Sequence, residues 1–158
     1  MILEVFTDGG ASPNNSSGTG GWAAIIPQQG NLSKTYRVWG GEFPSTNNAM
    51  EIMAGVKILD FIKEHNLVEG FDSILIYSDS AYHVKGANLW AAKWKANKWV
   101  TGEKTEVKNL DLWKAIIKHK ETFSVPIEWK WVKAHVGNRY NEECDELVKK
   151  AIQEQKKL

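Results

Sequence analysis

Four acidic residues occupy positions that a purely structural role explains poorly. Asp8 and Asp79 are expected at the ends of two β-rich runs, and Asp145 lies at the margin of a helical apolar stripe. Glu51 falls on a predicted helix roughly opposite the polar residue Asp60, so its carboxylate should face the core. A buried carboxylate is costly unless a basic partner, a raised pKa or a metal ion compensates it. These side chains are therefore the first candidates for chemistry.

Convergence of four carboxylates would require a counter-charge. Each close pair repels by roughly 4 kcal/mol at an effective dielectric of about 20. Oxygen ligands suit Mg²⁺ or Mn²⁺, whereas zinc prefers His and Cys, which are few in this chain and never at zinc spacing. Two such ions about 3.5 to 4 Å apart can activate water and stabilise the leaving oxygen at a phosphodiester. These residue types therefore favour metal-dependent phosphodiester hydrolysis.

Each residue also has a simpler interpretation. Asp8 precedes two glycines and would then be a turn residue, Asp79 would be part of a helix cap, and Asp145 would be an exposed helix residue. His135 would be a surface loop histidine, and Cys144 a core filler. Taken singly, these residues do not decide between the two interpretations.

The elements that position the acids alternate between strand and helix signals. Three β-rich runs come first, and the first of them stops at Asp8. A helix with Thr46 or Asn47 as its N-cap follows, and then a strand buried on both faces that ends at Asp79. Helical signals continue with an interruption at Gly86, before a further helix, a fifth strand and a last helix. The expected ranges are strands at 1–8, 22–28, 33–43, 73–79 and 126–134, and helices at 46–61, 80–99, 109–122 and 141–154.

This order predicts an α/β fold with a five-stranded mixed sheet, three antiparallel N-terminal strands and helices on both faces. In such sheets, ligands gather at the carboxyl ends of the strands. The length of 158 residues fits one domain, residues 1–158. We see no repeat, low-complexity tract or linker that would divide it.

Bulk composition excludes several classes of protein. With 42% hydrophobic and 25% charged residues, the chain is neither disordered nor a coiled coil. Its net charge of +1 excludes whole-surface steering toward nucleic acid but allows a local basic patch. The single Cys144 cannot form an internal disulfide, and the sequence has no leader-like start and no apolar run of about 18 residues. We therefore expect a cytoplasmic protein with no membrane partner, and a monomer is the default expectation for its oligomeric state.

Five stretches carry a resemblance to a known family. The chain closely resembles bacterial type 1 ribonuclease H (ribonuclease HI) in "FTDGG", "TNNAMEIMAG", "YSDSAYHVKG", "VKNLDLWKAI" and "WKWVKAHVGNRYNEECDELVKKA", in this order and with these separations. The four acids fall in four separate motifs, and the resemblance spans nearly the whole chain. It implies the ribonuclease H-like fold and an endonuclease that hydrolyses the RNA strand of RNA/DNA hybrids, leaving 3′-hydroxyl and 5′-phosphate ends.

The resemblance also implies a set of catalytic residues. Carried over position by position, it makes Asp8, Glu51, Asp79 and Asp145 the metal-binding catalytic acids. His135 matches a loop histidine that the family uses near the active site, for proton transfer or product release. The implied cofactor is Mg²⁺, as two ions with substrate, and Mn²⁺ is the expected substitute.

Residues 85–108, which we call the basic handle, contain six lysines against two glutamates, a local net charge of +4. Trp90, Trp94 and Trp99 are interleaved with the lysines, an arrangement that offers phosphate contacts and flat apolar surfaces. The alternative is a solvated helix whose tryptophans pack in the core. The segment resembles the protrusion with which bacterial-type members grip the hybrid.

Further substrate contacts are implied by the same resemblance. Tyr82 and Trp90 match the DNA-strand channel, and Thr46 and Asn109 match a phosphate pocket. Minor-groove residues of the family are matched by Asn14, Asn47 and Asn48. Amides at such positions can distinguish the RNA strand through its 2′-hydroxyls. The expected substrate-binding residues are Asn14, Thr46, Asn47, Asn48, Tyr82, Trp90, Lys93, Trp94, Lys95, Lys98 and Asn109.

Some positions depart from the family pattern, and two other functions stay open. Pro44 stands where an Arg is common beside the phosphate pocket, Ala81 replaces a longer side chain, and Ala134 stands where Gly usually precedes the histidine. A non-cleaving hybrid-binding module would bind without turnover. A DNA-acting nuclease or transposase relative would cut duplex DNA comparably to the hybrid.

Overall fold

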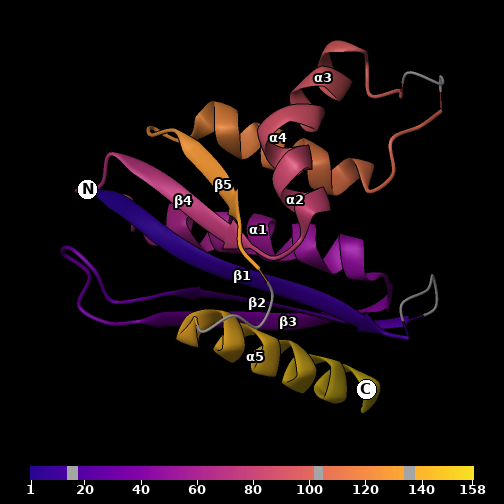
Figure 1. Cartoon of the computed structure of the whole chain (residues 1–158), viewed down its shortest axis with the longest axis horizontal. Coiled ribbons are helices and arrows are strands. Elements are labelled where there is room, and N and C mark those ends of the chain that lie inside the picture. Colours follow the sequence, from indigo (N-terminus) through magenta and orange to yellow (C-terminus); the bar gives the residue numbers. More distant parts are fainter. Residues whose placement is uncertain (14–17, 102–104, 134–137) are drawn as a thin grey trace.

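The computed structural model describes residues 1–13, 18–101, 105–133 and 138–158. Within these residues, five strands form one sheet in the order β3-β2-β1-β4-β5 (Figure 1). β1 pairs antiparallel with β2 and parallel with β4, while β2 and β3 are antiparallel and β4 and β5 are parallel. The strands are β1 (Ile2–Ser12), β2 (Gly18–Ile26), β3 (Tyr36–Ser45), β4 (Ser73–Ser78) and β5 (Ile127–Trp131). The predicted mixed sheet with three antiparallel N-terminal strands is confirmed.

Two long helices cover opposite faces of this sheet (Figure 1). α1 (Asn47–Glu64) packs against β1 and β2, and α5 (Arg139–Lys156) packs against β1, β2 and β3. Of the two predicted N-caps, Thr46 is the one that caps α1, by accepting a hydrogen bond from the Ala49 N–H at 3.2 Å. The Asn138 side chain caps α5 in the same way, with the N–H groups of Tyr140 and Asn141 as donors.

The helical region after β4 consists of four pieces. These are α2 (Ala81–Lys85), the π-helical turn η1 (Gly86–Trp90), α3 (Ala91–Ala96) and α4 (Leu110–Thr122). A Cβ on Gly86 would lie 2.2 Å from a ring carbon of Trp113 on α4, so only glycine allows this approach. The interruption predicted at Gly86 is therefore a local widening of the helix to accommodate a buried tryptophan.

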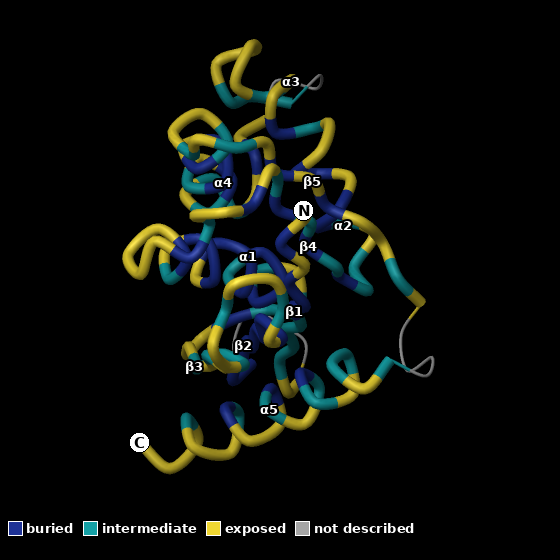
Figure 2. The backbone as a smooth tube through the Cα atoms, turned by 90° about the vertical axis from the view of Figure 1, so that its left-hand side faces the viewer, coloured by how far each residue is buried: buried dark blue, intermediate teal, exposed yellow. Residues whose placement is uncertain are grey.

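The core lies between the sheet, α1 and α4. Its largest cluster includes Leu3, Ile58, Ile76 and Trp113, all 0% exposed. Figure 2 shows buried backbone concentrated in the central strands and α1, while most of α3 is exposed. None of the helices in the described ranges is long and apolar enough to span a membrane.

Two sequence-based expectations near the acids are wrong. β1 does not stop at Asp8 but continues to Ser12, because β2 keeps pairing with it as far as Ser12 opposite Thr19. β4 is fully buried on one face only: Ile76 and Ser78 are buried, whereas Tyr77 between them is partly exposed. The cover on the second face is incomplete because α5 lies over β1, β2 and β3.

Candidate active site

Asp8 lies where β1 diverges from β4. Their parallel pairing ends with Phe6 opposite Tyr77, while β1 continues beside β2 with Asp8 opposite Ala23. Asp79 directly follows the last residue of β4. The two acids therefore lie at the same end of neighbouring parallel strands, where ligand sites of such sheets form.

Gly9 brings α1 against this end of β1. A Cβ at Gly9 would lie 2.3 Å from the carbonyl carbon of Met50 and 2.5 Å from the Glu51 nitrogen. No side chain fits there, so the strand backbone contacts the first turns of α1 directly. This contact places Glu51 beside Asp8.

Asp8, Glu51 and Asp79 form what we call the carboxylate cluster. Each contributes one oxygen, and these three oxygens all lie within 4.8 Å of one another. Glu51 is only 7% exposed, which confirms that it faces inward, and its Oε2 accepts a hydrogen bond from the Ser78 hydroxyl at 3.3 Å. Three hard oxygen donors in this space fit a divalent cation such as Mg²⁺ or Mn²⁺.

Electrostatics in the cluster favours uptake of positive charge. The pKa of Asp8 is raised from 3.8 to about 7, first by burial and second by the charge of Asp79. Burial also raises the pKa of Glu51, with the charges of Asp8 and Asp79 as further causes. A site that holds protons near neutral pH in the absence of metal will exchange them for a cation that binds the same oxygens.

Asp145 lies at the edge of the cluster. It lines the same cavity of about 460 Å³ as the three other acids, but it is not part of the group whose oxygens lie within 4.8 Å. Its carboxylate is 28% exposed and pairs with Lys149 one turn later on α5, at 3.1 Å. The structure thus brings oxygens of three of the four predicted acids within 4.8 Å of one another and the fourth acid to the same cavity.

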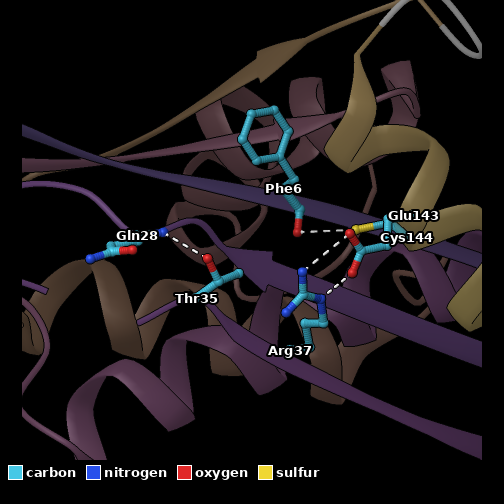
Figure 3. A network of polar contacts seen from close by, with 6 residues as sticks. All are labelled: Phe6, Gln28, Thr35, Arg37, Glu143 and Cys144. Atoms are coloured by element: carbon cyan, nitrogen blue, oxygen red, sulfur yellow. Dashed lines mark hydrogen bonds and ion pairs between the residues drawn. The ribbon is translucent and has the colours of Figure 1, made fainter. Parts of the chain in front are cut away.

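The helix that carries Asp145 is anchored to two strands (Figure 3). Arg37 of β3 holds Glu143 through two guanidinium nitrogens, one of them at 3.3 Å from Oε1. Cys144 is fully buried, and its thiol contacts the Phe6 carbonyl oxygen at 3.6 Å. Burial raises the pKa of this thiol well above its usual range, so it stays protonated and serves as core packing.

Figure 3 also shows a hydrogen bond in the connection between β2 and β3. The Gln28 backbone N–H donates to the Thr35 hydroxyl at 3.1 Å.

A second cavity, of about 690 Å³, shares Asn48 with the first. Its lining residues are Thr46, Asn48, Tyr82, Lys108 and Asn109. The Tyr82 hydroxyl accepts hydrogen bonds from the Asn109 amide at 3.4 Å and from the Trp113 indole at 3.3 Å. Asn48 lines both cavities, so the two are adjacent.

Comparison with known proteins assigns the chain to a family. A family model for RNase H matches residues 2–153. Ribonuclease H of Bartonella quintana (strain Toulouse) is 41% identical over 99% of this chain and 92% of its own length. Ribonuclease H of Wolbachia pipientis wMel is 44% identical over 94% of this chain and 93% of its own length. The chain belongs to the ribonuclease H family.

Solved structures share the fold of this ribonuclease H. LC9-RNase H1, described as a type 1 RNase H with the type 2 active-site motif, superposes with a TM-score of 0.78 at 24% identity, covering 98% of this chain and 73% of that one. LC11-RNase H1, solved in complex with an RNA/DNA hybrid, superposes with a TM-score of 0.69 at 18% identity, covering 96% and 97%. These superpositions show that the chain has the fold of these solved RNase H structures.

The basic handle of this ribonuclease H combines exposed lysines with half-buried tryptophans. Lys93, Lys95 and Lys98 are all exposed, and Lys95 also pairs with Glu121 of α4 at 2.5 Å. Trp94 packs against the main core and lies 6.0 Å from Trp90 and 5.8 Å from Trp113 between ring centroids. Packed aromatic side chains below solvent-facing charge are what the alternative interpretation expects, and the grip on a hybrid stays a prediction.

The base of the handle is joined to β5. The Asn88 amide donates to the Trp129 carbonyl oxygen at 2.7 Å, and the Trp129 N–H donates to the Asn88 side-chain oxygen at 3.1 Å. Lys120 of α4 donates to the Ala87 carbonyl oxygen at 2.7 Å. These bonds tie η1 to the sheet edge and to α4.

The remaining predicted residues divide into two groups. Asn47 lines the first cavity, where its side-chain oxygen accepts a bond from the Ala11 N–H at 2.6 Å. His135 and Asn14 lie outside the described residues.

Sequence reasoning missed several residues that shape the site. Gly9 was interpreted as a turn signal, although a glycine inside a strand also signals close backbone approach. Ser78 gave no signal beyond being a small polar residue in a buried strand. Lys149 stands four residues after Asp145, a spacing from which their pairing could have been predicted.

Proposed function

We propose that this ribonuclease H hydrolyses the RNA strand of RNA/DNA hybrids at a metal site formed by Asp8, Glu51, Asp79 and Asp145. One observation carries the proposal: three carboxylate oxygens from separate elements lie within 4.8 Å of one another. Mutual repulsion makes such a cluster costly unless protons or a cation neutralise it. The cofactor we infer is Mg²⁺, as two ions with substrate, with Mn²⁺ as a substitute.

The roles of the acids follow from their burial. Divalent cations at such a site activate water and stabilise the charge that develops on the phosphate and leaving oxygens. Glu51, the most buried acid, has the least freedom and fixes the inner side of the site. Asp145 is more exposed and shares its charge with Lys149, so it can adjust to an incoming substrate at the rim. No side-chain nucleophile is needed.

Substrate grip is proposed for the surfaces beside the acids. The second cavity offers two hydroxyls, two amides and Lys108 to a backbone phosphate, and Asn48 connects it to the acidic cavity. Asn47 and Asn48 provide amides next to the acids, and such groups can bond the 2′-hydroxyls that mark an RNA strand. Tyr82, Trp90 and the handle lysines would hold the DNA strand. Little preference for base sequence is expected from such contacts.

The unit of function we propose is the single domain 1–158 acting as a cytoplasmic monomer, with residues 85–108 as its handle. His135 and Asn14 keep the roles that the family resemblance implies.

The decisive test supplies purified protein with a labelled RNA/DNA hybrid and Mg²⁺. We expect internal cleavage of the RNA strand with 3′-hydroxyl and 5′-phosphate ends, no cleavage in chelator, and no comparable cleavage of duplex DNA of the same sequence. Intact RNA at every Mg²⁺ and Mn²⁺ concentration would leave a binding module as the function. Equal cleavage of both duplexes would indicate a DNA-acting relative.

A further inference from the structure

Ser78 has a buried hydroxyl that is hydrogen-bonded to the carboxylate cluster. It is the last residue of β4, 0% exposed, and it follows Ile74 and Ile76 on the strand face that packs into the core. A buried hydroxyl in an otherwise aliphatic row is costly unless it is hydrogen-bonded. Its partners therefore indicate why it is there.

Both of its hydrogen bonds have a fixed direction. The Ser80 N–H donates to the Ser78 Oγ at 3.1 Å, so this oxygen already serves as an acceptor. A hydroxyl has one proton to donate, and that proton goes to Glu51 Oε2 at 3.3 Å. The Ser78 side chain thus connects the start of α2, beyond β4, with the inner acid on α1.

The backbone around Ser78 is held as well. Its carbonyl oxygen accepts a bond from the Val132 N–H at 2.9 Å, and the Trp131 indole donates to the carbonyl oxygen of Asp79 at 3.0 Å. Next along the chain, the Ser80 hydroxyl accepts from the His83 N–H at 3.1 Å and caps α2. The backbone around Ser78 is therefore held both by the bonds from Trp131 and Val132 and by the capped start of α2, and this fixes the hydroxyl that donates to Glu51.

We propose that Ser78 is a positioning residue that sets the rotation of the Glu51 carboxylate for metal binding. With Oε2 bonded to the hydroxyl, the carboxylate presents its oxygens to Asp8 and Asp79 in one orientation instead of many. A hydrogen-bond donor that fixes a carboxylate ligand raises metal affinity, because the carboxylate then loses less rotational freedom when the metal binds. This inference rests on the proposed function, since it takes Glu51 as a ligand.

A matched pair of substitutions separates positioning from packing. Ser78→Thr keeps the hydroxyl, and Ser78→Val has nearly the same volume without it, so any crowding of the added methyl groups is common to both. Ser78→Ala removes the hydroxyl without adding volume. Thermal melts in chelator report the packing cost of each change separately from metal binding.

The measurements are calorimetric titration with Mg²⁺ alone and hybrid cleavage as a function of Mg²⁺ concentration. We expect Ser78→Val and Ser78→Ala to bind Mg²⁺ about 10-fold more weakly and to require about 10-fold more Mg²⁺ for half-maximal cleavage, with an unchanged KM for the hybrid. Ser78→Thr should stay within about 2-fold of the unsubstituted protein. Where Thr or Val fails to fold, Ser78→Ala against the unsubstituted protein decides alone.

The outcomes distinguish this inference from the proposed function. The positioning role alone is excluded if the unsubstituted protein binds Mg²⁺ and cleaves the hybrid while the Ser78→Thr and Ser78→Val variants behave alike. The same conclusion follows if the Ser78→Ala variant matches the parent. An unsubstituted protein that neither takes up Mg²⁺ nor cleaves removes both. Loss of affinity in Val and Ala with rescue by Thr supports the role of the hydroxyl.

Discussion

The carboxylate cluster and the basic handle concentrate charge of opposite sign in opposite ways. In the cluster, close backbone contact at Gly9 brings Glu51 of α1 beside Asp8 of β1, and the pairing of β1 with β4 brings Asp79 to the same end of the sheet. In the described part of the handle, the lysines are exposed, and Trp94 and Trp99 pack against the core. Like charges are thus crowded in one region and spread out in the other.

This difference separates two tasks. Crowded, buried carboxylates raise one another's pKa and create a demand for cations, which is useful only where chemistry takes place. Exposed lysines on a rigid base cost little and attract phosphates over a distance set by salt. Changes in the cluster should therefore alter turnover, and changes in the handle should alter affinity.

The sharpest way to break this separation is Asp8→Asn, which keeps the shape of the side chain and removes its charge. We expect kcat for hybrid cleavage in Mg²⁺ to fall by about 10³-fold or more, equivalent to about 4 kcal/mol of transition-state stabilisation. The dissociation constant for the hybrid should stay within about 3-fold, because the handle is untouched. Single-turnover cleavage and binding in chelator measure the two quantities.

Glu146→Gln on the exposed side of α5 is the control for charge removal alone. It should leave both quantities unchanged. Near-normal turnover by Asp8→Asn would contradict the assignment of the cluster as the catalytic site.

The sequence predicted much of this arrangement, and the misses share a physical cause. The order of elements, the Thr46 cap and the inward-facing Glu51 follow from periodicity and capping, which act within a few residues. The continuation of β1 past Asp8 depends on pairing with β2, and the approach of α1 at Gly9 depends on contact between distant segments. Patterns within a few residues of sequence carry no information about either of these two contacts.

The same reasoning explains what was seen of the site. Four acids in separate motifs indicated convergence, but only three-dimensional packing shows that Asp145 stands apart with Lys149. The hydrogen bond from the Ser78 hydroxyl to Glu51 depends on how β4 and α1 lie relative to each other in the fold, and no pattern in the sequence specifies this.

The second prediction addresses the handle. Replacement of Lys93, Lys95 and Lys98 together by Gln should weaken hybrid binding by about 30-fold at moderate salt, with kcat at saturation changed by less than about 2-fold. The slope of log affinity against log salt should fall by about one for each lost phosphate contact. Because Lys95 already pairs with Glu121, its share of the loss should be smaller than that of Lys98. Binding titrations at several salt concentrations measure these effects.

A charge-matched control replaces Lys34, Lys57 and Lys118, which are exposed lysines outside the handle. It should retain most of the affinity. Equal losses in the two triple variants would mean that overall charge, and not the handle, binds the hybrid.

The smallest expected effect concerns stability without metal, where crowding in the cluster is uncompensated. Burial and the Asp79 charge raise the pKa of folded Asp8 from 3.8 to about 7. Between these values the folded protein keeps a proton that the unfolded chain has lost, so the free energy of unfolding falls as pH rises through this window. Asp8→Asn carries no such charge. In chelator its free energy of unfolding should match that of the parent near pH 4 and exceed it by a few kcal/mol at pH 8, with a Tm higher by several degrees.

Mg²⁺ should reverse this order, because it binds the folded parent and stabilises it by mass action while the variant has lost a ligand. Thermal melts of both proteins across pH 4 to 8, with and without Mg²⁺, measure the crossing, and Glu146→Gln again serves as the control. A lower Tm for Asp8→Asn at pH 8 in chelator, or a difference that does not change with pH, would mean that the Asp8 charge is not strained in the folded protein. The contrast between a crowded cluster and a relaxed handle would then lose its energetic basis.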